Sequence, residues 1–296
     1  MELQKIIELL ESNDKANVFL ALELAQNYQA EFEVHYGTTV ENYKILFDWF
    51  DRQAFHGKMI PLKRTHLDLS EFGLHQIPAQ IALLAQLKWL NLSGNHFKIL
   101  PPEIGKLLRL ETLLLCECPL RTLPPEIGQL AQLKELNIED NVLESLPPEI
   151  AHLKHLNEIN LRENHFKNFP SGICGLKKLQ NLDLAANQIQ TLPAEIGQLS
   201  SLGELYLNHN QLTEIPPEIG RLASLYYLDV RSNQLTSLPS EIGQLKDLEH
   251  LDVSHNCLQT LPDTLLELPY VNIYVAGNSD LKVSDKLRNS GKLIFE

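Results

Sequence analysis

Residues 202–224 read LGELYLNHNQLTEIPPEIGRLAS, and close variants of these 23 residues follow one another along most of the chain. A fixed period of about 20 to 30 residues predicts a solenoid of stacked units, in which each unit packs on its neighbours. Nine full units and a partial tenth begin at Arg64, Leu87, Leu110, Leu133, Leu156, Leu179, Leu202, Leu225, Leu248 and Tyr270.

The first half of each unit predicts a short strand followed by a structural asparagine. Apolar pairs such as Leu205 and Leu207 alternate with polar residues, which is the pattern of a strand with one buried face. An asparagine follows in most units, as at Asn210, and its carboxamide both donates and accepts hydrogen bonds. We expect it to satisfy backbone groups that would otherwise be buried unpaired, at a cost of about 1 to 3 kcal/mol each.

The second half of each unit carries the motif L-P-x-E-I-G-x-L, as in residues 100–107, 123–130, 192–199 and 238–245. Proline presets φ, and the glutamate is favourably placed near the N-terminus of a short helix. The isoleucine of the motif, for example Ile219, is expected to face the core.

On these motifs, residues 64–278 resemble the leucine-rich-repeat superfamily. The second half of the unit resembles the class found in Ras-pathway scaffolds, plant intracellular Ras-group repeats, Roco proteins and many bacterial proteins. The resemblance implies an α/β solenoid, a right-handed horseshoe with a concave parallel sheet and a convex face of short helices or extended turns. It does not specify a partner, because this repeat hosts many functions.

A solenoid needs a cover at each end, and the flanking segments are predicted to supply it. Residues 1–63 have apolar residues at helical spacing and predict an N-terminal cap of about three helices, the third opened by a capping box of Thr38 and Glu41. Residues 279–296 predict a short C-terminal cap, in which residues 292–295 add apolar cover or a last edge strand.

Composition argues against several functional classes. The 38 acidic and 25 basic residues give a net charge of -13, which disfavours nucleic acid. No apolar run approaches the roughly 20 residues that span a bilayer, and the N-terminus does not resemble a secretion signal. With only four cysteines, a cytoplasmic protein is expected, although a translocated effector remains open.

Catalysis and metal binding are not expected. The sequence has no phosphate loop and no C-x-x-C or H-E-x-x-H motif, and both flanks are too short for the kinase, GTPase or ubiquitin-ligase domains that enzymes of the family carry. His209 and His255 should lie two strands apart, roughly 10 Å, which is too far for one zinc ion. Cys118 stands at the asparagine position and is interpreted as structural, and carboxylates around Cys116 should raise its pKa. No cofactor is indicated.

Polar positions of the strands predict two candidate binding regions on the concave face. Exposed aromatic residues and arginine are enriched at interaction hot spots, and the late repeats gather Tyr206, Tyr227, Tyr274, His209, His250, His255 and Arg231. Earlier repeats gather an acidic patch of Glu117, Glu135, Glu139, Asp140, Glu158 and Glu163, which is either a surface for a basic partner or a solvated face. Trp89 is either an anchor for a partner or a contact of the N-terminal cap.

The sequence therefore predicts a non-catalytic scaffold that binds a protein on its concave face. By analogy with Ras-pathway scaffolds, a small GTPase or another signalling protein is an imaginable partner. The alternatives are a bacterial effector or ubiquitin-ligase substrate adaptor whose catalytic part is separate, and a sensor of a peptide or small ligand.

Overall fold

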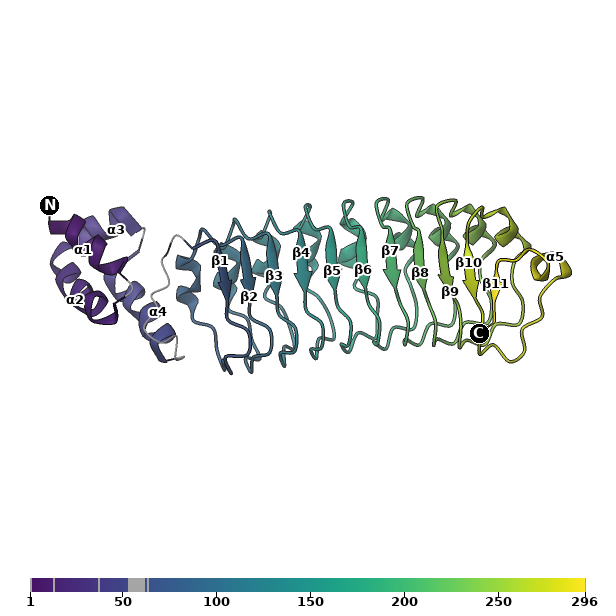
Figure 1. Ribbon diagram of the computed structural model, residues 1–296, viewed down its shortest axis with the longest axis horizontal. Helices are drawn as coiled ribbons and strands as arrows, with labels where there is room; N and C mark the ends of the chain where they lie inside the picture. Colours follow the sequence, from purple (N-terminus) through teal and green to yellow (C-terminus); the bar gives the residue numbers. More distant parts are fainter. Residues whose placement is uncertain (1, 13, 37, 53–61, 63, 296) are drawn as a thin grey trace.

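The computed structural model describes residues 2–12, 14–36, 38–52, 62 and 64–295. Its strands lie side by side in sequence order and form one parallel sheet along an elongated solenoid (Figure 1). The strands are β1 (His66–Asp68), β2 (Trp89–Asn91), β3 (Thr112–Leu114), β4 (Glu135–Asn137), β5 (Glu158–Asn160), β6 (Asn181–Asp183), β7 (Glu204–Tyr206), β8 (Tyr227–Asp229), β9 (His250–Asp252), β10 (Asn272–Tyr274) and β11 (Leu293–Ile294).

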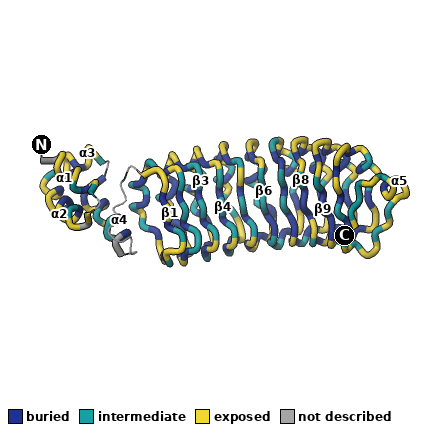
Figure 2. Tube along the Cα trace, viewed as in Figure 1, coloured by how far each residue is buried: buried dark blue, intermediate teal, exposed yellow. Residues whose placement is uncertain are grey.

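The strands stack in register because the repeat length is constant. Each residue of β1 to β9 pairs with the residue 23 or 22 positions later, as Leu205 pairs with Leu228. The central residue of every strand from β1 to β10 is buried, while its two neighbours in most strands are partly or fully exposed. The leucines therefore form one continuous core along the solenoid. In Figure 2 the buried stretches of chain, drawn in dark blue, recur from repeat to repeat.

Short 3-10 helices form the opposite side of each repeat, as the proline motif predicts. They are η2 (Ala79–Leu83), η3 (Pro102–Lys106), η4 (Pro125–Gln129), η5 (Pro148–His152), η6 (Ser171–Gly175), η7 (Ala194–Gln198), η8 (Pro217–Arg221), η9 (Ser240–Gln244) and η10 (Asp263–Glu267). The glycine of the motif permits their close stacking, because a Cβ at Gly128 would lie 2.5 Å from the carbonyl oxygen of Glu149 in the next repeat.

The buried asparagines join each repeat to the one before it. Asn210 accepts a hydrogen bond from the Ile189 amide through Oδ1 and donates through Nδ2 to the carbonyl oxygens of Leu184 and Leu207. Equivalent bonds are made by Asn95, Asn141, Asn164, Asn187, Asn233, Asn256 and Asn278, which together with Asn210 we call the asparagine ladder. Cys118 stands in this series, and its thiol donates to the Leu92 carbonyl oxygen at 3.5 Å.

The described part of residues 1–63 is helical and contains four α-helices, where about three were expected. They are α1 (Glu2–Leu10), α2 (Lys15–Ala25), α3 (Gln29–Tyr36) and α4 (Val40–Arg52), with a 3-10 turn η1 (Gln26–Tyr28). At the start of α4 the hydroxyl of Thr39 accepts from the Asn42 amide, so the N-cap contact is made one residue later than the expected capping box of Thr38 and Glu41. No helix among the described residues is long and apolar enough to cross a membrane.

Helix α4 belongs to two separate cores. Its first part, with Val40 and Tyr43, packs with α1 to α3, whereas Leu46, Trp49 and Phe50 join the core of the solenoid. The helical cap therefore covers the first repeat through α4, while α1 to α3 form a small core of their own.

At the other end, the chain closes the solenoid with α5 (Asp285–Arg288) and β11. Leu287 of α5 is fully buried against the last repeat, and β11 pairs in parallel with β10. Residues 293 and 294 thus form a last edge strand, one of the two roles considered for this segment.

Candidate functional site

The concave face carries the third and fifth positions of each repeat, counted from its first leucine. The fifth-position Asp or Asn has a structural role that the sequence reading missed, because its Oδ1 accepts a hydrogen bond from the backbone amide two residues later. Asp229 accepts from Arg231 at 3.0 Å, and Asn137 from Glu139 at the same distance. Asp229 and Asp252 are buried in this role.

Four rings from four neighbouring strands contact one another in succession on this face, and we call them the aromatic row: Tyr206, Tyr227, His250 and Tyr274. The centroids of successive rings are 5.0, 4.2 and 4.6 Å apart, and the rings of Tyr227 and His250 are within 3° of parallel. Where two rings are nearly parallel, as for Tyr227 and His250, each covers a face of the other and leaves its edge free for a contact. Ring edges are electropositive and favour hydrogen-bond acceptors.

Carboxylates lie beside the aromatic row and set its electrostatics. Burial raises the pKa of Asp229 to about 6, against the opposing effect of the Arg231 amide and side chain. Arg231 remains half exposed with its Nε 3.4 Å from Asp229 Oδ2. Burial also lowers the pKa of His250, so this imidazole remains neutral at a lower pH than a free histidine.

Two of the predicted histidines lie beyond the strands and outside the row. The strands β1 to β10 are only three residues long, and the eighth position of the repeat adopts a left-handed turn with φ between 52° and 70°. His209 and His255 occupy this position at one rim of the sheet, as do Glu117, Asp140 and Glu163 of the acidic patch. The expectation that these five belong to the strand surface is therefore corrected.

Arg162 lies among the residues of the acidic patch and neutralises part of its charge. Arg162 lies 3.5 Å from Glu139 Oε1 and 2.8 Å from Glu163 Oε1. Glu135 and Glu158 face each other across β4 and β5. The pKa of Glu158 is raised, chiefly by partial burial and further by the negative charges of Glu135 and Glu204.

The remaining candidates at the start of the solenoid have local contacts. Trp89 is partly buried on β2, with its ring 6.4 Å from that of His66. The pKa of Cys116 is raised, mainly by burial and also by the charge of Glu139. Burial raises the pKa of Cys118 to about 11. Both thiols are therefore poor nucleophiles at neutral pH. Among the described residues, no group of three His, Cys, Asp or Glu is placed to hold a metal ion.

The sequence reading missed a cavity of about 530 Å³ beside β5 to β7. We call it the Gly203 cavity; it is lined by Asn157, Glu158, Gln180, Asn181, Ser201, Gly203, Glu204, Ser224 and Tyr226. Gly203 was the available signal, since it interrupts a column in which the other repeats from the second to the ninth carry longer side chains.

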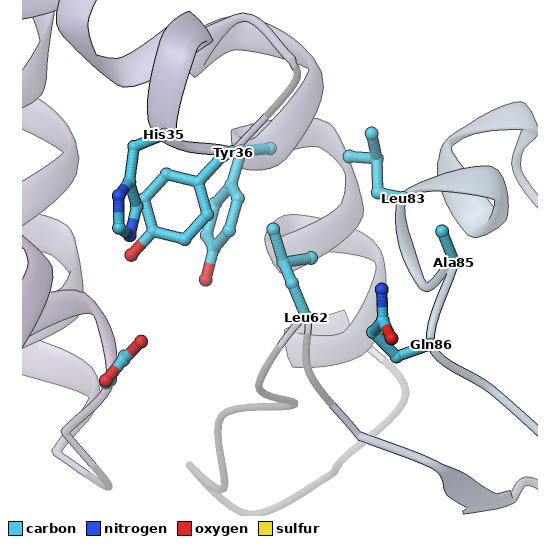
Figure 3. Close-up of a pocket in the computed structure, with 8 residues that line it drawn as sticks. His35, Tyr36, Leu62, Leu83, Ala85 and Gln86 are labelled. Atoms are coloured by element: carbon cyan, nitrogen blue, oxygen red, sulfur yellow. The ribbon is translucent and has the colours of Figure 1, made fainter.

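A second cavity lies at the other end of the molecule, between the helices and the first repeat. It has a volume of about 230 Å³, and Tyr36, His35, Leu62 and Gln86 are among the residues around it (Figure 3). The Tyr36 hydroxyl is buried there and has no hydrogen-bond partner among the residues that the structure describes. This cavity is far along the chain from the aromatic row and is not joined to it.

Comparison with known proteins identifies the repeats. Residues 65–160 and 126–214 match the model of a leucine-rich repeat region, and residues 223–279 match a second model described as leucine rich repeat. The chain belongs to the leucine-rich-repeat family. No curated protein is significantly similar to it in sequence.

Solved leucine-rich-repeat structures resemble the chain over most of its length. The ectodomain of the plant membrane receptor kinase GASSHO1/SCHENGEN3 from Arabidopsis thaliana, in complex with CASPARIAN STRIP INTEGRITY FACTOR 2, has a TM-score of 0.70 and 27% identity over 81% of this chain. A TDR receptor has a TM-score of 0.64 and 29% identity over 75% of the chain. The leucine-rich-repeat chain spans only 30% and 42% of the lengths of these two proteins.

Proposed function

We propose that this leucine-rich-repeat chain is a non-catalytic scaffold that binds a protein partner on its concave face, with the aromatic row as the principal contact. The observation that supports this proposal most strongly is the uninterrupted series of ring contacts from Tyr206 through Tyr227 and His250 to Tyr274, across β7 to β10. Aromatic side chains have few rotatable bonds, so they lose little conformational entropy when a partner covers them, and tyrosine is enriched at energetic hot spots.

The surroundings of the row fit a polar protein surface. Arg231 is exposed beside it, and the tyrosine edges favour carbonyl and other acceptor groups. Glu135 and Glu158 extend the same face with negative charge, which complements a basic region of the partner. Support also comes from the similar GASSHO1/SCHENGEN3 ectodomain, which was solved in a complex with another factor.

The test is site-specific photocrosslinking in native lysate. A benzophenone amino acid placed at Asn272, which is exposed on β10, should crosslink a partner, whereas the same group at Ser200, exposed beyond η7, should not. The double variant Tyr227→Ala/Tyr274→Ala should weaken binding of the crosslinked protein about 30-fold, as expected for loss of hot-spot residues.

Tyr270→Ala is the matched control, because Tyr270 is 82% exposed and lies outside the aromatic row. Crosslinking from Ser200 alone, or equal losses for the control and the double variant, would reject the concave site. A Glu135→Lys variant that abolishes binding while the tyrosine variants do not would move the contact to the acidic patch.

A further inference from the structure

The Gly203 cavity arises from one glycine in a column of larger side chains. In the earlier repeats this column is self-neutralising, since Lys88 and Lys134 lie 3.1 and 2.6 Å from the two oxygens of Glu111. At Gly203 there is no side chain, and a Cβ there would lie 2.7 Å from Cε1 of Tyr226. The ring of Tyr226 therefore leans over the glycine and reaches the next carboxylate.

That carboxylate, Glu204, is held by three donors from three repeats. The Tyr226 hydroxyl donates to Oε1, the Tyr206 hydroxyl donates to Oε2 at 2.7 Å, and Asn181 Nδ2 donates to Oε2 at 3.1 Å. Glu204 is consequently fixed in place without a cation. Because Asn181 uses its amide nitrogen in this contact, its Oδ1 remains an acceptor.

Glu158 forms the other charged wall of the cavity. Partial burial and the nearby Glu135 and Glu204 raise its pKa, so its charge is poorly compensated. Within the part of the chain that the structure describes, the ion pairs involve none of Glu135, Glu158 and Glu204. The cavity also presents the side-chain amides of Asn157 and Gln180, whose carbonyl oxygens are further acceptors.

We propose that the Gly203 cavity binds the basic side chain of a protein segment lying on the concave face, with arginine preferred to lysine. The guanidinium group offers five donors in a plane, which suits a site with two carboxylates and several amide oxygens, whereas an ammonium offers three. Glu158 supplies the ion pair. The exposed face of Tyr226 is available to stack on the guanidinium.

The cavity is continuous with the aromatic row, which is why one segment reaches both. Glu204 is the register partner of Tyr227 and accepts from Tyr206, so the first two rings of the row stand beside the cavity wall. This inference rests on the proposed function, because it assigns a specificity site to the same bound segment.

The test uses the full chain and three small probes: N-acetyl-argininamide, N-acetyl-lysinamide and the neutral isostere N-acetyl-citrullinamide. Binding is followed by chemical-shift titration of amides in residues 157–158, 180–181 and 203–204. The arginine probe should bind more tightly than the lysine probe, and the citrulline probe should bind at least about tenfold more weakly, the cost of one charge-assisted contact.

Glu158→Gln keeps the shape of the side chain but removes its charge. It should lower the affinity for the arginine probe about tenfold. Glu214→Gln is the matched control, since Glu214 is exposed and lies outside both the cavity lining and the acidic patch, and it should leave the affinity unchanged. Equal affinity for the arginine and citrulline probes, or equal losses for the two variants, would overturn the proposal.

The two experiments distinguish an error in the cavity proposal from an error in the proposed function. If the Asn272 crosslink depends on Tyr227 while the arginine probe does not bind, the cavity proposal is wrong and the scaffold proposal stands. If the probe binds in a Glu158-dependent way but nothing crosslinks at Asn272, the cavity recognises an arginine-like ligand and the proposed protein-binding function is wrong.

Discussion

At the residue scale, the repeats depend on one buried side chain each, the asparagine of the ladder. Cys118 is an imperfect member, because a thiol cannot offer the amide oxygen that accepts a backbone bond in the other repeats. At Asn141 that oxygen accepts from Leu120 N at 3.1 Å, and Asn141 Nδ2 donates to Leu115 O at 2.8 Å.

Cys118→Asn should therefore raise the free energy of unfolding by about 1 kcal/mol, the net contribution of a hydrogen bond gained in the interior. Urea denaturation followed by circular dichroism measures the change. The reverse substitution at a complete position, Asn141→Cys, should lower stability by about 1 to 3 kcal/mol. A destabilised Cys118→Asn variant would show that the loop around Cys118 cannot accept the larger amide.

Asp229 is a buried residue whose charge opposes folding. Its pKa is raised from 3.8 to about 6, so the folded chain binds a proton that the unfolded chain has already lost between these values. The contribution of Asp229 to stability consequently falls as pH rises from about 4 to about 6. Asn91, Asn137 and Asn160 stand at the same position in other repeats and accept the same backbone bond.

We expect Asp229→Asn to be more stable than the parent by about 1 kcal/mol at pH 7.5, because it keeps the backbone bond without the buried charge. The advantage should disappear at pH 4. Denaturation of both proteins at the two pH values gives the difference directly. Asp68→Asn, at an exposed position of the same kind, should change stability by less than about 0.5 kcal/mol. An advantage for Asp229→Asn that is equal at both pH values would contradict the assignment to charge.

At the scale of the element, the C-terminal helix α5 acts as a plug for the open end of the solenoid. Leu287 is its fully buried side chain, and Leu281 nearby is only partly buried. Leu287→Ala should lower the free energy of unfolding by about 2 kcal/mol or more, because it opens a cavity in the core. Leu281→Ala should lower the free energy of unfolding by less than half as much as Leu287→Ala. Equal losses for the two variants would mean that α5 does not seal the end of the solenoid.

The strands and turns that recur in every repeat could be predicted from the sequence. The alternation of leucines around Leu205 and Leu228 placed the strands, and the asparagines placed the turns, because both recur every 23 residues. The left-handed eighth position was not foreseen, although Gly94 and Gly277 stand in the same column and indicate a positive φ. The cavity could not be predicted, since Gly203 creates it only together with side chains from four repeats.

At the scale of the whole molecule, α4 contributes side chains to two cores, and Leu62 packs against both of them. Phe32 is fully buried in the helical core, whereas Trp49 packs in the core of the solenoid. Phe32→Ala should increase amide hydrogen exchange in residues 2–36 and leave residues 87–110 protected, because local stability follows local packing.

Trp49→Ala should instead increase exchange in the first repeats, since it uncovers the end of the solenoid. Exchange measured by mass spectrometry on both variants separates the two cores. Equal exposure of both regions by either substitution would mean that the helices and the solenoid unfold as a single unit.

The direction of the asparagine ladder has a consequence for synthesis. Each asparagine bonds backward, as Asn233 does to the Leu212 amide 21 residues earlier and the Leu207 carbonyl 26 residues earlier. A repeat that has just left the ribosome therefore lacks the hydrogen bonds of the next ladder asparagine. These bonds form only after the following repeat has been translated. We expect the nascent protein to assemble in one direction, with a single unfinished turn that moves along the chain until Asn278 forms its bonds to Leu258 and Val253.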